Sequence, residues 1–122
     1  MLIFNEIQQS HNFSLDLPWP RDLHLIQICT ELVEHPDSQK DMDTWANQIG
    51  TSSRTLIRLF QKETGLNFRH WLQRMHVVLA LGYLSEHVPI SHIAHKLGYR
   101  SSSTFTAMFK RQLGVPPSHF RK

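Results

Sequence analysis

The chain has almost no cysteine, weak strand signals and no long apolar run, and each shortage excludes a class of protein. Cys29 is the only cysteine, which excludes an internal disulfide and a thiolate zinc site. No apolar stretch reaches membrane-spanning length, and the N-terminus lacks the basic and apolar regions of a signal peptide. We therefore expect a protein of the reducing cytoplasm, in which Cys29 is a small core residue.

The sequence also lacks a catalytic constellation, since no serine, cysteine or carboxylate set suggests a reaction. The chain has nine histidines, which invite a metal-site interpretation. His92 and His95 lie three residues apart on one expected helix face, and His87 is near. With Glu86 as the only nearby carboxylate, the set has too few ligands and no group to orient them. We predict no enzyme, no cofactor and no metal, and expect these histidines to face solvent.

Charge is divided unevenly along the chain. Residues 1–48 hold eight acidic and two basic side chains, whereas residues 49–122 hold eleven basic and two acidic ones. The formal net charge of +3 therefore conceals a basic C-terminal part. A basic face of this kind is expected of a protein that binds phosphates, and the alternative is an ordinary solvated surface.

One pattern of apolar and glycine positions occurs twice, and such a repeat should be interpreted before any other feature. The offset is 48 residues before the turn glycine and 49 after it. The first copy consists of Met42, Trp45, Ala46, Ile49, Gly50, Leu56, Leu59, Phe60, Gly65, Phe68 and Trp71. The second copy consists of Ile90, Ile93, Ala94, Leu97, Gly98, Phe105, Met108, Phe109, Gly114, Pro117 and Phe120.

Each copy predicts a helix-turn-helix motif. A small alanine lets two helices pack closely, and the glycine supplies a left-handed turn between them. Two such motifs in tandem predict binding to double-stranded DNA by an all-α protein. We expect the aromatic side chains of the repeat to be core residues rather than a platform for single strands: Trp45, Phe60, Phe68, Trp71, Phe105, Phe109 and Phe120.

Helical periodicity dominates from residue 21 onward and sets the expected elements. A first helix over 21–34 should bury Leu25, Ile26, Cys29, Leu32 and Val33. Helix-turn-helix motifs are predicted over about 43–64 and 90–113, with a linker helix over about 67–85 and a last turn over 118–121. The expected N-caps are Asp43, Ser52 or Ser53, and Ser101 or Ser102. The linker helix should carry one apolar stripe of Phe68, Trp71, Leu72, Met75, Val78, Leu79 and Tyr83.

The outer face of the second helix in each motif should read base edges. The expected base-reading residues are Arg54, Thr55, Ile57 and Arg58 in the first motif, and Arg100, Ser102, Ser103, Thr104 and Ala107 in the second. An arginine grips guanine with two hydrogen bonds, whereas short hydroxylic side chains discriminate less sharply. Residues placed for phosphates are Ser52, Lys62, Arg74, Lys110 and Arg111.

The length of the linker helix suggests how two motifs could share one duplex. At about 1.5 Å per residue, a helix over 67–85 is on the order of 28 Å long. This is slightly shorter than a duplex turn of roughly 34 Å. We expect both recognition helices to enter successive major grooves of one asymmetric site, with DNA that bends toward the protein.

The two copies, the segment Leu56–Gly65 (LIRLFQKETG) and the ending Phe109–Arg121 (FKRQLGVPPSHFR) resemble the DNA-binding domain of the AraC/XylS family of bacterial transcription regulators. The resemblance covers residues 21–121. It implies seven helices in two helix-turn-helix subdomains joined by a long central helix, location at the bacterial nucleoid, and activation of transcription by contact with RNA polymerase. Family members often carry arginine where Ala107 stands.

Residues 1–20 read differently from the rest. Leu17–Pro20 (LPWP) is an extended connector, because two prolines flank a tryptophan, and it resembles family members in which a cupin-like sensing domain comes first. We expect residues 1–20 to be a linker or the end of such a domain, and residues 21–122 to be the DNA-binding domain. Any effector would bind a domain outside this chain. The alternative is a short stand-alone regulator in which Leu2, Phe4 and Ile7 dock onto the first helix.

Two functions from other classes compete with specific DNA binding. One is a helical module that binds nucleic acid, including RNA, without specificity, and the other is a protein adaptor. The outer faces over 54–58 and 100–104 discriminate, because an adaptor would present apolar groups there. These faces are basic and hydroxylic, which favours DNA.

Overall fold

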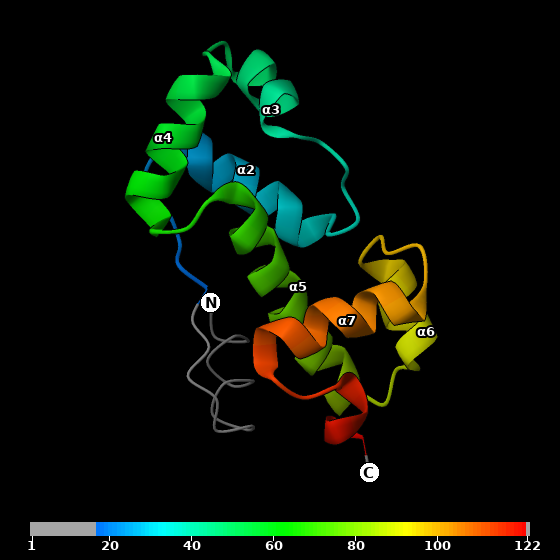
Figure 1. The fold of residues 1–122 in the computed structure, drawn as a ribbon. Helices are drawn as coiled ribbons and strands as arrows, with labels where there is room; N and C mark the ends of the chain where they lie inside the picture. The colour runs from blue at the N-terminus through cyan, green and yellow to red at the C-terminus, as the bar shows by residue number, and fades with distance from the viewer. Residues whose placement is uncertain (1–16, 122) are drawn as a thin grey trace. The chain divides into compact units, whose positions relative to one another are not determined.

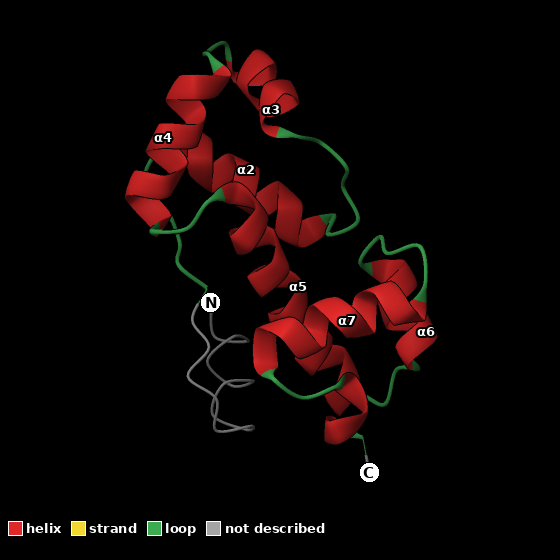
Figure 2. Cartoon of the chain, viewed as in Figure 1, coloured by secondary structure: helices red, strands yellow, loops and turns green. Residues whose placement is uncertain are grey.

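The computed structural model describes residues 17–121, and all regular secondary structure in this range is helical (Figures 1 and 2). The elements are α2 (Leu23–Glu34), α3 (Met42–Ile49), α4 (Ser53–Thr64), α5 (Phe68–Ser85), α6 (Ile90–Lys96), α7 (Ser102–Leu113) and the 3₁₀ helix η1 (Pro117–Phe120). The expected all-α fold with two helix-turn-helix motifs is confirmed. Leu2, Phe4 and Ile7, which the stand-alone alternative docks onto the first helix, lie outside the described residues.

The described chain forms two compact units. The N-terminal unit comprises Pro18–Leu72, and the C-terminal unit comprises residues 73–121. In the first, α3 and α4 are the two helices of the helix-turn-helix motif, and in the second α6 and α7 play these parts (Figure 1). The long helix α5 contributes its first residues to one unit and the rest to the other.

Helix α2 begins two residues later than predicted and buries a different face. Asp22 is its N-cap and accepts a hydrogen bond from the Leu25 N–H at 3.1 Å. Ile28 is buried in place of the predicted Ile26, which is half-buried together with Val33. The prediction of Leu25, Cys29 and Leu32 as core residues is confirmed, as all three are buried: Leu25 0%, Cys29 0%, Leu32 1% exposed.

Helix α3 starts at a different cap from the one predicted. Asp41, not Asp43, accepts from the Thr44 N–H at 2.9 Å and from the Thr44 hydroxyl at 2.8 Å. These bonds to its carboxylate lower the pKa of Asp41. Asp43 instead accepts a hydrogen bond from the Ser53 hydroxyl of α4. The second aspartate therefore joins the two helices of the motif.

Glycine ends three helices where the repeat predicts a turn. Gly50 follows α3 with φ +88°, a left-handed conformation that side-chain-bearing residues rarely adopt. Gly65 follows α4 and Gly114 follows α7, with φ of 77° and 80°. In the motif of the C-terminal unit, Leu97 is the C-cap of α6 and Gly98 makes the left-handed turn.

Each unit has its own apolar core. Aromatic side chains of α4 and α5 meet in the N-terminal unit, where the Phe60 ring packs edge-on against Trp71 at 5.9 Å. The core of the C-terminal unit is a cluster from α5, α6 and α7: Val77, Ala80, Leu81, Leu84, Ile93, Ala94, Leu97, Phe105, Met108 and Phe109. The single stripe predicted for α5 is incomplete, because it omits the four α5 members of this cluster.

Candidate nucleic-acid interface

Helix α4 separates a buried face from an exposed one, and the predicted base-reading side chains lie on the exposed face. Leu56 and Phe60 are buried at 2% and 0% exposure, whereas Ile57 is 47% exposed. Arg54 and Arg58 are exposed as well, one turn apart on the same side of the helix. The exposed face thus offers two guanidinium groups and an isoleucine.

The first turn of α4 is fixed by hydroxyl groups. Ser52 is the N-cap and accepts from the Thr55 N–H at 3.1 Å, while its hydroxyl donates to Thr55 Oγ1 at 2.9 Å. The expectation that Ser52 or Ser53 caps this helix is therefore confirmed for Ser52. Because Thr55 Oγ1 is the acceptor in the second bond, its own hydroxyl proton is left to donate to a base or phosphate oxygen.

Helix α7 repeats the same first turn 49 residues later. Ser101 is the N-cap and accepts from the Thr104 N–H at 3.1 Å. Its hydroxyl lies 2.9 Å from Thr104 Oγ1 and 3.0 Å from Ser103 Oγ. Ser102 and Ala107 are exposed beside them. The start of α7 is consequently a hydroxyl network with no cation within the helix until Lys110.

The repeat identifies a position that the sequence reasoning omitted. With the offset of 49, Arg54 corresponds to Ser103, Ile57 to Thr106, and Arg58 to Ala107. Thr106 is half-buried on α7 and lies on the same side of the helix as Ser103 and Ala107. Applying the offset to the base-reading set, rather than only to the core, would have found it.

The four cationic residues among those predicted for phosphates fall into two groups. Lys62, Lys110 and Arg111 are exposed near the C-terminal ends of α4 and α7. Arg74 is half-buried on α5 and has an interaction partner within the protein. The exposed cations are thus the better placed of the predicted phosphate contacts.

A tyrosine anchors the chain just before Arg100 and α7. The Tyr99 hydroxyl lies 2.8 Å from His76 Nδ1 on α5, and its ring packs against Phe105 at 5.6 Å. Burial raises the pKa of Tyr99 to about 12, and the charge of Arg111 acts in the opposite direction. Tyr99 therefore stays protonated at neutral pH and holds the exposed Arg100 next to the recognition helix.

Cys29 is a free, buried cysteine. Burial raises the pKa of the Cys29 thiol to about 12, so the reactive thiolate is not formed at neutral pH. Residues 17–121 contain no group of three or more potential ligands that could hold a metal ion. No helix in this range is long and apolar enough to cross a membrane.

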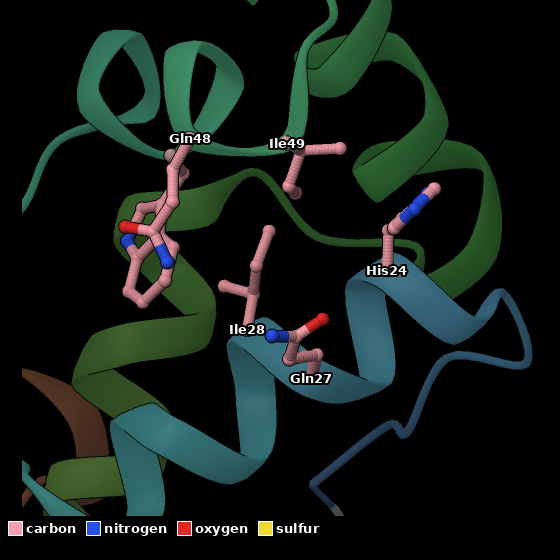
Figure 3. Close-up of a pocket in the computed structure, with 6 residues that line it drawn as sticks. His24, Gln27, Ile28, Gln48 and Ile49 are labelled. Atoms are coloured by element: carbon pink, nitrogen blue, oxygen red, sulfur yellow. The ribbon is translucent and has the colours of Figure 1, made fainter.

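A pocket of about 190 Å³ lies between α2 and α3, and residues that line it are drawn in Figure 3. Its lining residues are His24, Gln27, Ile28, Trp45, Gln48 and Ile49. None of them belongs to the predicted DNA-contacting set, and no carboxylate or cysteine is among them. The Trp45 indole N–H is buried without a hydrogen-bond partner.

The chain is similar in sequence to known helix-turn-helix proteins. Residues 45–122 match the model of a family described as a helix-turn-helix domain. The HTH-type transcriptional regulator NimR of Escherichia coli K12 is 33% identical over 119 residues, which are 98% of this chain and 44% of that protein. The HTH-type transcriptional activator RhaR of Salmonella dublin is 29% identical over 127 residues, covering 98% of this chain and 45% of that protein. The chain thus spans less than half the length of these relatives.

Solved structures agree with the fold of the two units. The C-terminal domain of AraT, a response regulator from Geobacillus stearothermophilus, aligns with a TM-score of 0.74 and 26% identity over 82% of this chain and 84% of that one. The DNA-binding domain of AdpA, solved in complex with a target DNA, aligns with a TM-score of 0.70 and 30% identity over 78% of this chain and 86% of that one.

Proposed function

We propose that this chain binds one asymmetric DNA site through both motifs. The chain belongs to the AraC-type helix-turn-helix family, whose members are DNA-binding transcription regulators and not enzymes. Helix α4 reads one half of the site and α7 reads the other, each in its own major groove. Binding at this site regulates bacterial transcription by activating it.

One observation carries the proposal. Two recognition helices with the same serine cap and the same glycine stop expose different side chains, arginines on α4 and hydroxyls on α7. A symmetric dimer on a palindrome needs only one recognition helix per chain. A chain that holds two dissimilar helices matches a site with two dissimilar halves.

The partners of the proposed complex follow from the same reasoning. Duplex DNA is the direct ligand, bound at promoters in the bacterial nucleoid, and RNA polymerase is the protein contacted during activation. Support for activation comes from the relatives named as transcriptional activators. An effector would act through a domain outside these 122 residues.

Selection from a pool of random duplexes tests the proposal. The 122-residue chain should enrich a non-palindromic motif within about 20 base pairs, roughly two duplex turns. The α4 half should be guanine-containing and more sharply defined than the α7 half, because arginine reads guanine by two bonds. A non-specific binder enriches no motif, and a protein adaptor retains no DNA. Either result would contradict the proposed function.

A further inference from the structure

The C-terminal turn of α4 carries a carboxylate that binds the start of α2. Glu63 Oε1 accepts hydrogen bonds from the backbone N–H groups of Arg21 and Asp22, each at 2.8 Å. Hydrogen bonds to an ionised acceptor are roughly twice as strong as neutral ones. Glu63 therefore ties the first recognition helix to the point where the chain leads into α2.

The same stretch of chain is held at a second point. We call Pro18–Asp22 the lead-in segment. The indole N–H of Trp71 donates to the Pro18 carbonyl at 2.7 Å, and the ring of Trp19 lies 6.0 Å from that of Trp71. Trp71 is fully buried against Phe60 of α4. The lead-in segment is thus bonded to the C-terminal turn of α4 and to the first turn of α5.

The C-terminal unit contains a counterpart of this link. Gln112 lies 49 residues after Glu63, and its Nε2 donates to Gln73 Oε1 of α5 at 3.1 Å. Gln73 lies 12 positions before Ser85, the last residue of α5. Asp22 likewise lies 12 positions before Glu34, the last residue of α2. In each unit the recognition helix is therefore hydrogen-bonded to the helix that precedes its helix-turn-helix motif, or to the chain just before that helix. Only in the N-terminal unit is the link charged, made to backbone and located where the chain leads in.

We propose that Glu63 is a positioning residue for base reading, so that a displacement of the lead-in segment is transmitted along α4 to Arg54 and Arg58. The proposal rests on the proposed function, in which α4 reads one half of the site. Arg54 and Glu63 belong to one continuous helix, nine residues apart, or about 14 Å along its axis. A helix is stiff over this length, so a shift at Glu63 reorients the arginines.

Variants of the 122-residue chain test the link, with Gln112 as the matched control. Glu63→Ala should lose roughly tenfold in affinity for the selected duplex, the scale of a charged hydrogen bond. It should distinguish that duplex less sharply than wild type does from one whose α4 half is scrambled, yet detect a scrambled α7 half as well as wild type does. Glu63→Gln keeps an acceptor oxygen and should restore most of the discrimination. Gln112→Ala should change affinity less than about twofold, because it removes an exposed neutral pair.

A measurement without DNA separates the failure of this proposal from that of the proposed function. In Glu63→Ala, the backbone amide resonances of residues 54–58 should shift, while those of residues 103–107 stay in place. If they shift but wild type ignores both scrambled halves, the proposed function fails and the positioning role stands. If they stay in place and Glu63→Ala binds like wild type, the positioning role is overturned.

Trp71→Phe provides a second variant should Glu63→Ala fail to fold. The substitution removes the hydrogen bond to Pro18 and part of a buried indole, and it keeps an aromatic ring in the core. We expect the amides of residues 54–58 to shift in the same direction, with an affinity loss of about threefold on the selected duplex, as for one neutral hydrogen bond. Unchanged amides in this variant would also overturn the positioning role.

Discussion

The two recognition helices share a scaffold and differ in the chemistry they expose. Both start at a serine cap that binds a threonine three residues on, and both end at a left-handed glycine. Phe60 and Phe109, related by the repeat, are both fully buried. On the exposed side the two helices differ, because Arg58 of α4 corresponds to Ala107 of α7 in the repeat. Packing thus fixes the inner positions in both copies, while the outer positions differ in charge and polarity.

The largest effect should follow from removing the arginine that distinguishes α4. Arg58→Ala should cost about 1–3 kcal/mol of binding free energy on the selected duplex and little on random DNA, because a bidentate contact to guanine is lost. Gel-shift titrations on the two duplexes measure the difference. An equal loss on both would assign Arg58 to a phosphate instead of a base.

Placing arginine at the equivalent position of α7 should make the two helices more alike. Ala107→Arg leaves the core unchanged, since Ala107 is exposed. It should add a guanine preference worth about 1–2 kcal/mol in the α7 half of the site. Repeating the selection with this variant shows whether a new guanine appears. A motif identical to that of wild type would mean that residue 107 does not face the bases.

The shared caps predict equal contributions to stability. Ser52→Ala and Ser101→Ala should each lower the free energy of unfolding by about 1 kcal/mol, because each leaves a first-turn N–H without its acceptor. Urea unfolding followed by circular dichroism measures both, with exposed Ser118→Ala as the control. A loss at one serine only would show that the two first turns are not equivalent in solution.

The smallest difference between the two helices is expected in the DNA affinity lost when one exposed lysine is removed from each. Lys62→Ala and Lys110→Ala should weaken binding to specific and random duplexes by the same factor. Each should also reduce the slope of log affinity against log salt by about one unit. Titrations at several salt concentrations provide the slopes. A change confined to the specific duplex would place that lysine among the base-reading residues.

The ends of the two recognition helices could be predicted from the sequence because they depend on local interactions. Serine caps and left-handed glycines act within a few residues, so the bounds of α4 and α7 follow from the text of the chain. The face that a helix buries depends instead on its partners. Helix α2 has apolar residues on a broad arc, and packing selects Ile28 over Ile26.

The features that escaped prediction depend on tertiary contacts. Glu63 binds N–H groups 41 and 42 residues away, and no local pattern indicates such a pair. Helix α5 buries additional positions such as Val77 and Leu81 because it serves two units. Thr106 is different, since the repeat offset alone was sufficient to find it.

The most direct test of the central account is the stoichiometry of the complex on a duplex of about 20 base pairs. Native mass spectrometry of the 122-residue chain with the selected duplex should show one chain per duplex. Exchanging the two half-sites, with their spacing kept, should abolish specific binding, because α4 and α7 occupy fixed positions in the chain order. Two chains on a palindromic duplex, or full affinity after the exchange, would contradict the account.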